Sequence, residues 1–121
     1  MKKIHAPFYA LSGMIVLTLL AAGACSKAKT PPPLPEVFCN GTISFSTQIA
    51  PMIEENCSGC HGAGAGTSPV LSNHAEISQN ADQIIHALRG TPQLMPEGGP
   101  ALADSLIQQF QCWLQQGTLN N

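Results

Sequence analysis

Apolar positions in the second half of the chain recur at helical rather than strand spacing. Over residues 81–88 they lie three or four positions apart, so they share one face of a helix that should end near Gly90. A longer stretch from Ala103 or Asp104 to Gln116 has the same periodicity. The two apolar faces, which we expect in the core, consist of Ala81, Ile84, Ile85 and Leu88 and of Leu106, Ile107, Phe110, Trp113 and Leu114.

A third helix is predicted to begin after Ser46, which is a suitable N-cap. Ile49, Met52 and Ile53 share one face of this helix. Pro51 fits only because it falls in the first turns, where its missing N–H has no intrahelical partner. The folded part of the chain is therefore expected to consist of short helices joined by Gly- and Pro-rich loops.

The start of the chain has a different pattern. Met1, Lys2 and Lys3 form a basic start, and residues 8–24 then run for 17 positions without a charge. This run is at the lower limit for crossing a membrane and ends in small residues, so a signal peptide over residues 1–24 is favoured over a transmembrane helix. We therefore expect export to the cell envelope.

Two processing routes are open for this signal. Ordinary cleavage can follow Ala24, whereas Gly23, Ala24 and Cys25 fit a bacterial lipobox that departs from the usual pattern only in having Ala22 in place of Leu. A lipid on Cys25 would anchor the chain to a membrane facing the periplasm. Residues 25–36 would then be a Pro-rich linker, extended at about 3.1 Å per residue, and residues 37–121 the folded domain.

Charge and composition exclude one class of partner. Only 10% of the 121 residues are charged, and the net charge is −2. Removing residues 1–24 would leave three basic against seven acidic side chains, a net charge of −4. Such a chain has no basic surface for nucleic acid, so a protein partner with a neutral or basic docking surface is expected.

The residues that carry chemistry are concentrated at Cys57-Ser58-Gly59-Cys60-His61, the C-x-x-C-H arrangement of c-type haem attachment. Two thiols three positions apart on one turn can form thioethers with the two vinyl groups of one porphyrin. His61 then becomes the proximal iron ligand, with its other ring nitrogen held by a backbone carbonyl. The spacing therefore predicts one covalently bound haem c.

Three other uses of these cysteines are less favoured. A redox-active pair needs a preceding strand in a βαβ unit, which the helical pattern does not offer. A zinc site would combine Cys57, Cys60 and His61 with Cys39 or Cys112, but a histidine directly beside the second cysteine is poor spacing for a tetrahedral site. A disulfide between Cys57 and Cys60 would be strained.

Met95 is the leading candidate for the distal iron ligand. It lies in a loop rich in Pro and Gly, between two predicted helices, where its thioether can project freely. His86 falls on the polar side of its helix, and Met52 is better explained as a core residue. His74 and solvent stay open as alternatives.

The remaining cysteines can be assigned by elimination. If Cys25 carries lipid and Cys57 and Cys60 carry haem, then Cys39 and Cys112 are left to form a disulfide. Cys112 lies almost opposite the apolar face of the last helix, which favours a covalent link to a segment outside that helix.

Together these motifs resemble the small, exported, single-haem c-type cytochromes of bacteria. The resemblance covers residues 43–121 and rests on I-x-x-x-I before N-C-x-x-C-H-G, then M-P at Met95, then W-L-x-x-G at Trp113. It implies an all-α cytochrome c fold of three to five short helices around the haem, with Cys57 and Cys60 as attachment sites. It also implies His61 and Met95 as iron ligands. Phe110 and Trp113 are expected to pack on or near the haem.

The expected function is single-electron transfer, because an iron bound by histidine and methionine is closed to substrates. The chain would then be a carrier rather than an enzyme, with an oxidase, dehydrogenase or peroxidase as redox partner. The alternatives are a haem enzyme or ligand sensor with an open distal site and, less favoured, a structural metal-binding module.

Overall fold

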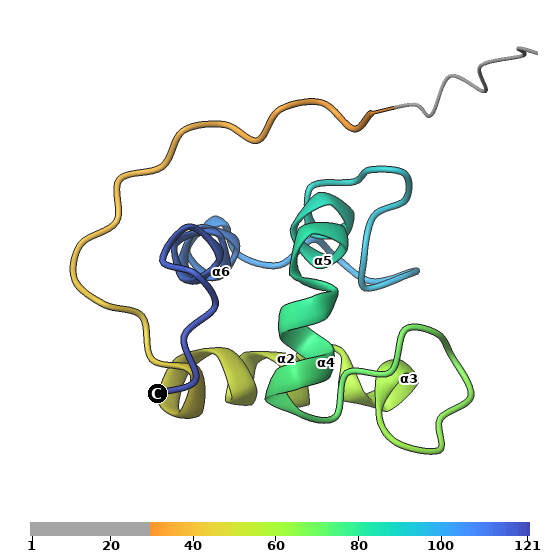
Figure 1. Cartoon of the computed structure of the whole chain (residues 1–121). Helices are drawn as coiled ribbons and strands as arrows, with labels where there is room; N and C mark the ends of the chain where they lie inside the picture. The colour runs from red at the N-terminus through yellow and green to blue at the C-terminus, as the bar shows by residue number, and fades with distance from the viewer. Residues whose placement is uncertain (1–29) are drawn as a thin grey trace, which may run out of the picture. The chain divides into compact units, whose positions relative to one another are not determined.

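Six short helical elements and the loops between them make up residues 30–121, the part of the chain that the computed structural model describes (Figure 1). The described residues contain no strand, so the all-α prediction is confirmed. The elements are η1 (Phe45–Ile49), α2 (Ala50–Asn56), α3 (Ser58–His61), α4 (His74–Gln79), α5 (Ala81–Leu88) and α6 (Asp104–Gln115).

The expected signal peptide, residues 1–24, and Cys25 lie outside the described residues. Within residues 30–121, none of the helices has the length and apolar character needed to cross a membrane.

The first helix begins two residues earlier than predicted. Ser44, not Ser46, is the N-cap, and its hydroxyl accepts a hydrogen bond from the Thr47 N–H at 3.4 Å. The first turn, η1, is a π-helix in which the Ile49 N–H donates to the Ser44 carbonyl. The regular α-helix α2 starts only at Ala50, directly before Pro51, which has no N–H to donate to the preceding turn.

Helices α5 and α6 follow the predicted bounds closely. The buried side chains of α5 are the four apolar residues predicted for its inner face. In α6, Ile107, Phe110 and Trp113 are buried, whereas Leu106 and Leu114 at the margins of the face are half-buried. Periodicity located the apolar face of each helix, but α6 also buries Gln111 and Cys112, which are bound to residues 34–43.

Helix α4 was not predicted, because it is short and has a single buried apolar residue, Ile77. Its N-cap, Asn73, accepts a hydrogen bond from the Glu76 N–H at 3.0 Å. The Glu76 carboxylate in turn accepts from the Ser72 N–H at 2.7 Å. These two side-chain contacts satisfy backbone donors that the first turn leaves without partners.

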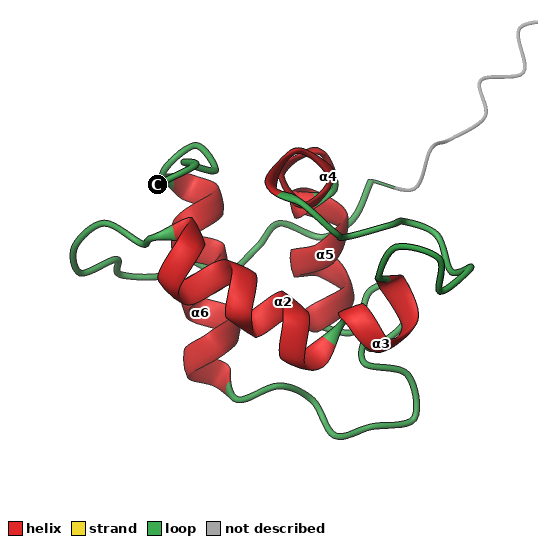
Figure 2. Cartoon of the chain, turned by 90° about the horizontal axis from the view of Figure 1, so that it is seen from below, coloured by secondary structure: helices red, strands yellow, loops and turns green. Residues whose placement is uncertain are grey.

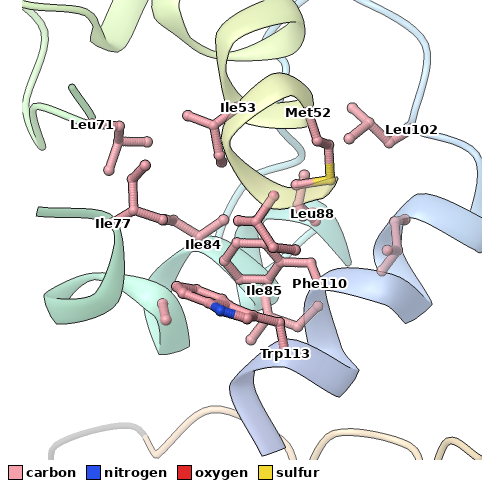
Figure 3. Packing of buried hydrophobic residues seen from close by; sticks show 13 residues of the cluster. Met52, Ile53, Leu71, Ile77, Ile84, Ile85, Leu88, Leu102, Phe110 and Trp113 are labelled. Atoms are coloured by element: carbon pink, nitrogen blue, oxygen red, sulfur yellow. The ribbon is translucent and has the colours of Figure 1, made fainter. Parts of the chain in front are cut away.

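The core lies where the rod formed by η1 and α2 crosses α6 and α5 (Figure 2). Trp113 and Phe110 are fully buried at its centre, together with Ile85 (Figure 3). The Trp113 indole N–H donates to the Leu119 carbonyl at 2.9 Å, so this buried donor is satisfied.

Residues 34–43, which we call the strap, run along α6 and are bound to it (Figure 1). A disulfide joins Cys39 of the strap to Cys112 of α6, with an S–S distance of 2.09 Å. Side-chain amides of α6 bind strap carbonyls on both sides of this disulfide: Gln111 donates to Pro35, Gln108 to Phe38 and Gln116 to Gly41.

The last residues of the expected linker therefore have a structural role that the sequence did not indicate. Leu34 packs against the core, and the Pro35 carbonyl accepts a hydrogen bond from the buried Gln111. Pro35 has no backbone N–H, so it can pair with α6 only through its carbonyl group. The Gln111 side-chain amide supplies the matching donor.

The disulfide should contribute substantially to stability, because it closes a loop between residues 73 positions apart. We expect the Cys39→Ser, Cys112→Ser double variant of the haem-loaded protein to lose about 4 kcal/mol of its free energy of unfolding, the value of the chain-entropy estimate for a loop of this length. Urea unfolding followed by circular dichroism measures this loss. A midpoint equal to that of the wild type would contradict the prediction.

Candidate functional site

The C-x-x-C-H motif lies on the single turn α3, directly after α2. Backbone hydrogen bonds from Cys60 and His61 to the Cys57 carbonyl, at 3.1 and 2.8 Å, hold the turn. Cys57 is at once the C-cap of α2 and the N-cap of α3. Because α2 packs against the core and leads directly into α3, the position of α2 fixes the backbone positions of Cys57, Cys60 and His61.

The two thiols differ in environment. Cys57 is half-buried and packs against the core cluster, whereas Cys60 is exposed. Burial raises the pKa of the Cys57 thiol to about 11, because the apolar surroundings disfavour the thiolate. At neutral pH this thiol is uncharged, and a thioether in its place would likewise bring no charge into the core.

The His61 imidazole is oriented by a hydrogen bond from its Nδ1 to the Pro69 carbonyl, at 2.8 Å. Since a carbonyl oxygen only accepts, Nδ1 must carry the proton and Nε2 is the nitrogen with a free lone pair. A backbone hydrogen bond joins the same two segments: the Leu71 N–H donates to the His61 carbonyl at 2.7 Å. The segment 69–71 thus holds both the ring and the main chain of His61.

Two adjoining cavities open between α3, α5 and the loop that contains Met95. Both are lined by Cys57, His61, Leu88 and Met95. The wall of the first is completed mainly by apolar side chains, including Leu71 and Ile84, and the second also borders Cys60, Pro96 and Glu97. The structure therefore brings Cys57, Cys60, His61 and Met95 together around two adjoining, largely apolar cavities.

Gly62, which follows the motif, is required by the helix itself. A Cβ atom at this position would lie 2.5 Å from the Ser58 carbonyl oxygen, a distance that would force the backbone apart. The Gly62 N–H donates to the same oxygen at 2.9 Å. The absence of a side chain at Gly62 therefore allows the hydrogen bond that ends α3. The sequence alone did not indicate this role.

The alternative ligands lie elsewhere. The His74 Nε2 is hydrogen-bonded to the Thr118 carbonyl at 2.8 Å, and the His74 ring packs edge-on against Phe45 at 4.7 Å. Met52 is a buried core residue. Neither residue lines the two cavities, and neither does His86.

The aromatic residues of α6 lie in the core. Phe110 and Trp113 do not line either cavity. They pack against each other with ring centroids 5.5 Å apart, and Trp113 also contacts Phe45 and His74. They share one buried cluster with Ile84 and Leu88 of α5, which supply apolar wall to the cavities, and their packing near a bound haem stays a prediction.

The zinc and redox alternatives lose their support. Cys39 and Cys112 are joined in a disulfide, so neither is available as a fourth zinc ligand. Within residues 30–121 no group of three or more His, Cys, Asp or Glu side chains is placed to hold a metal ion. A thioredoxin-like pair would need a strand before it, and α2 occupies that position.

The residues present fit a covalently attached haem. An apolar space bordered by both thiols, by a histidine with a free Nε2 and by a facing methionine has the chemistry that such a group needs. The carbonyl of Pro69 is the part of the site that sequence reasoning could not locate. Any backbone carbonyl can accept this bond, and only the tertiary structure selects one.

A small all-helical domain with this site belongs to the class of c-type cytochromes. Within that class, the chain is a member of the family described as cytochrome c oxidase, cbb3-type, subunit III, whose family model matches residues 47–113, more than half of the chain. No curated protein and no solved structure is similar enough to the chain to count as a match. Membership in this family makes the protein a carrier or subunit that transfers electrons through haem c.

Proposed function

We propose that the protein is a single-haem electron carrier of the bacterial cell envelope, in which His61 and Met95 bind the iron from opposite sides. Cys57 and Cys60 would hold the haem as thioethers. The observation that carries the proposal is that His61 and Met95 line the same two cavities together with Cys57. The bound haem supplies an iron that alternates between the ferrous and ferric states.

The role of His61 follows from its hydrogen bond to Pro69. With its proton held at Nδ1, the ring presents Nε2 to the cavity in a fixed orientation. An ordered ligand of this kind keeps the rearrangement that accompanies electron transfer small.

Met95 would close the other side of the site. Its backbone N–H donates to the Ala87 carbonyl at 3.1 Å, which ties the loop to the end of α5. A thioether in this position raises the reduction potential and occupies the coordination position that an external ligand would need. The protein would therefore relay electrons without transforming a small molecule.

The charge of the domain favours a basic or neutral partner surface. Arg89 is the one Lys or Arg among residues 30–121, against seven Asp and Glu. One of these acids, Glu97, borders the cavity next to Met95. An oxidase complex of the kind named by the family description, a dehydrogenase or a peroxidase would dock near this acidic border.

Replacing Met95 tests the ligand set directly. We expect Met95→Ala to abolish the weak red-region band that iron–thioether ligation gives in the ferric spectrum and to open the ferrous iron to carbon monoxide. Met52→Leu, a change to the buried methionine of α2, should leave both properties unchanged. A wild-type protein that lacks the band and binds carbon monoxide readily would instead indicate a haem enzyme or ligand sensor.

The attachment residues can be tested by denaturing electrophoresis with haem staining. We expect the Cys57→Ala, Cys60→Ala double variant to lose the stained band, because no thioether remains to retain haem in the unfolded chain. The Cys39→Ser, Cys112→Ser variant is the matched control and should keep the band. Staining that persists in the first variant would contradict the assignment.

The membrane anchor depends on Cys25. We propose that signal cleavage exposes Cys25 as a lipidated N-terminus and that residues 25–36 connect this anchor to the domain. Mass spectrometry of the mature protein should give an N-terminal Cys25 carrying acyl chains, and Cys25→Ala should release the protein from the membrane fraction. An unmodified N-terminus at Cys25 in wild-type protein would instead support ordinary cleavage and a free periplasmic carrier.

A further inference from the structure

Gln111 is the one buried polar side chain among the residues that the structure describes, and its exposed fraction is 0%. It lies on α6, one position before the disulfide cysteine Cys112 and away from the cavities. Electron transfer as proposed above makes no use of it. A fully buried amide is costly unless both of its ends are paired, so its partners define what it does.

Both ends of the Gln111 amide have a partner on a different segment. Its Oε1 accepts a hydrogen bond from Arg89 Nη2 at 2.6 Å, and its Nε2 donates to the Pro35 carbonyl at 2.6 Å. One side chain thus joins α6 to the strap on one side and to the end of α5 on the other. The bond to Arg89 is charge-assisted, which makes it the stronger of the two.

Arg89 is the C-cap of α5 and stands next to the residues that hold the Met95 loop. The Ala87 carbonyl accepts the N–H groups of both Gly90 and Met95, at 3.0 and 3.1 Å. Leu88, between Ala87 and Arg89, lines both cavities. A shift of the last turn of α5 would therefore move the backbone anchor of Met95 and one wall of the site together.

We infer that Gln111 and Arg89 are positioning residues for Met95, so that their hydrogen bond fixes the last turn of α5 against α6 and holds the thioether in the cavity. The apolar contacts between the two helices do not specify one position, because hydrophobic packing is non-directional. A paired buried amide does specify it, since a small displacement would leave the fully buried Gln111 amide without its partner. This inference rests on the proposed ligation by Met95.

The test uses the haem-loaded protein and measures how often Met95 leaves the iron. Gln111→Met conserves volume but removes both hydrogen bonds, to Arg89 and to the Pro35 carbonyl. We expect carbon monoxide to bind the ferrous variant about tenfold faster than the wild type, the effect of losing one charge-assisted hydrogen bond. The red-region band should weaken and the reduction potential should fall, since thioether ligation raises it.

A change at the buried Gln111 can also impair folding, so the same hydrogen bond is tested from its other end. Arg89 is exposed apart from this contact, and its replacement does not disturb the core. Arg89→Met should reproduce the effect of Gln111→Met, and Arg89→Lys, which retains a cationic donor, should restore most of the wild-type rate. The double variant Gln111→Met, Arg89→Met should bind carbon monoxide no faster than either single variant, because the two residues act as one unit.

Gln108→Ala is the matched control. Gln108 lies one turn away on α6 and donates to the strap at the Phe38 carbonyl, whereas the hydrogen bond of Arg89 goes to Gln111. This variant should keep the wild-type rate and potential. If Gln111→Met and Arg89→Met also keep both, the inference is overturned, whatever happens to their thermal stability.

Failure of the underlying ligand assignment would give a different result. A wild-type protein without the red-region band would show that Met95 does not bind the iron, and both the proposed ligation and this inference would then be wrong. A wild-type band that persists at full strength in Gln111→Met and Arg89→Met overturns the positioning role alone.

Discussion

The hydrogen bond between the His61 ring and the Pro69 carbonyl is the constraint on which the geometry of the site depends. The C-x-x-C-H turn fixes only where the imidazole begins, and rotation about its side-chain bonds would leave Nε2 without a defined direction. Pro69 removes that freedom and sets the tautomer at once. The second contact, between Leu71 and the His61 carbonyl, keeps the carbonyl of Pro69 within reach.

The rest of the fold supports this arrangement through the apolar face of α5. Ile84, Ile85 and Leu88 on this face belong to one buried cluster with Phe110 and Trp113. Ile84 and Leu88 also line the first cavity, so the core continues directly into the wall of the site. In a domain this small, few apolar side chains are available, so a bound haem would complete the interior as well as perform the chemistry.

The strap solves a related problem at the surface of α6. The strap forms no helix or strand, and glutamine side chains of α6 and of its C-cap Gln116 bind the strap carbonyls. The disulfide between Cys39 and Cys112 keeps these hydrogen bonds in register. Through Gln111 the strap is joined to Arg89, so the segment that leads toward the expected membrane anchor is part of the same network as the end of α5.

The sequence by itself determined the features that depend on neighbours a few positions apart. The spacing of Cys57, Cys60 and His61 identified the cofactor, and the periodicity of residues 81–88 and 104–115 located two helices with their buried faces. These signals are reliable because a haem-attachment turn and an amphipathic helix are local structures. Helix α4 was not predicted because its single buried apolar residue, Ile77, cannot define a helical period. The sequence could not decide between Ser44 and Ser46 as the N-cap, because either serine can cap a helix.

Only the tertiary structure decided how distant segments meet. It placed Met95, rather than His74 or His86, on the cavity that His61 lines, and it selected the Pro69 carbonyl among many equivalent acceptors. It also showed that Gln111 is buried between two segments that lie 76 and 22 residues away in sequence. Such contacts depend on how whole helices pack against one another, and that packing leaves no pattern within any single stretch of the chain.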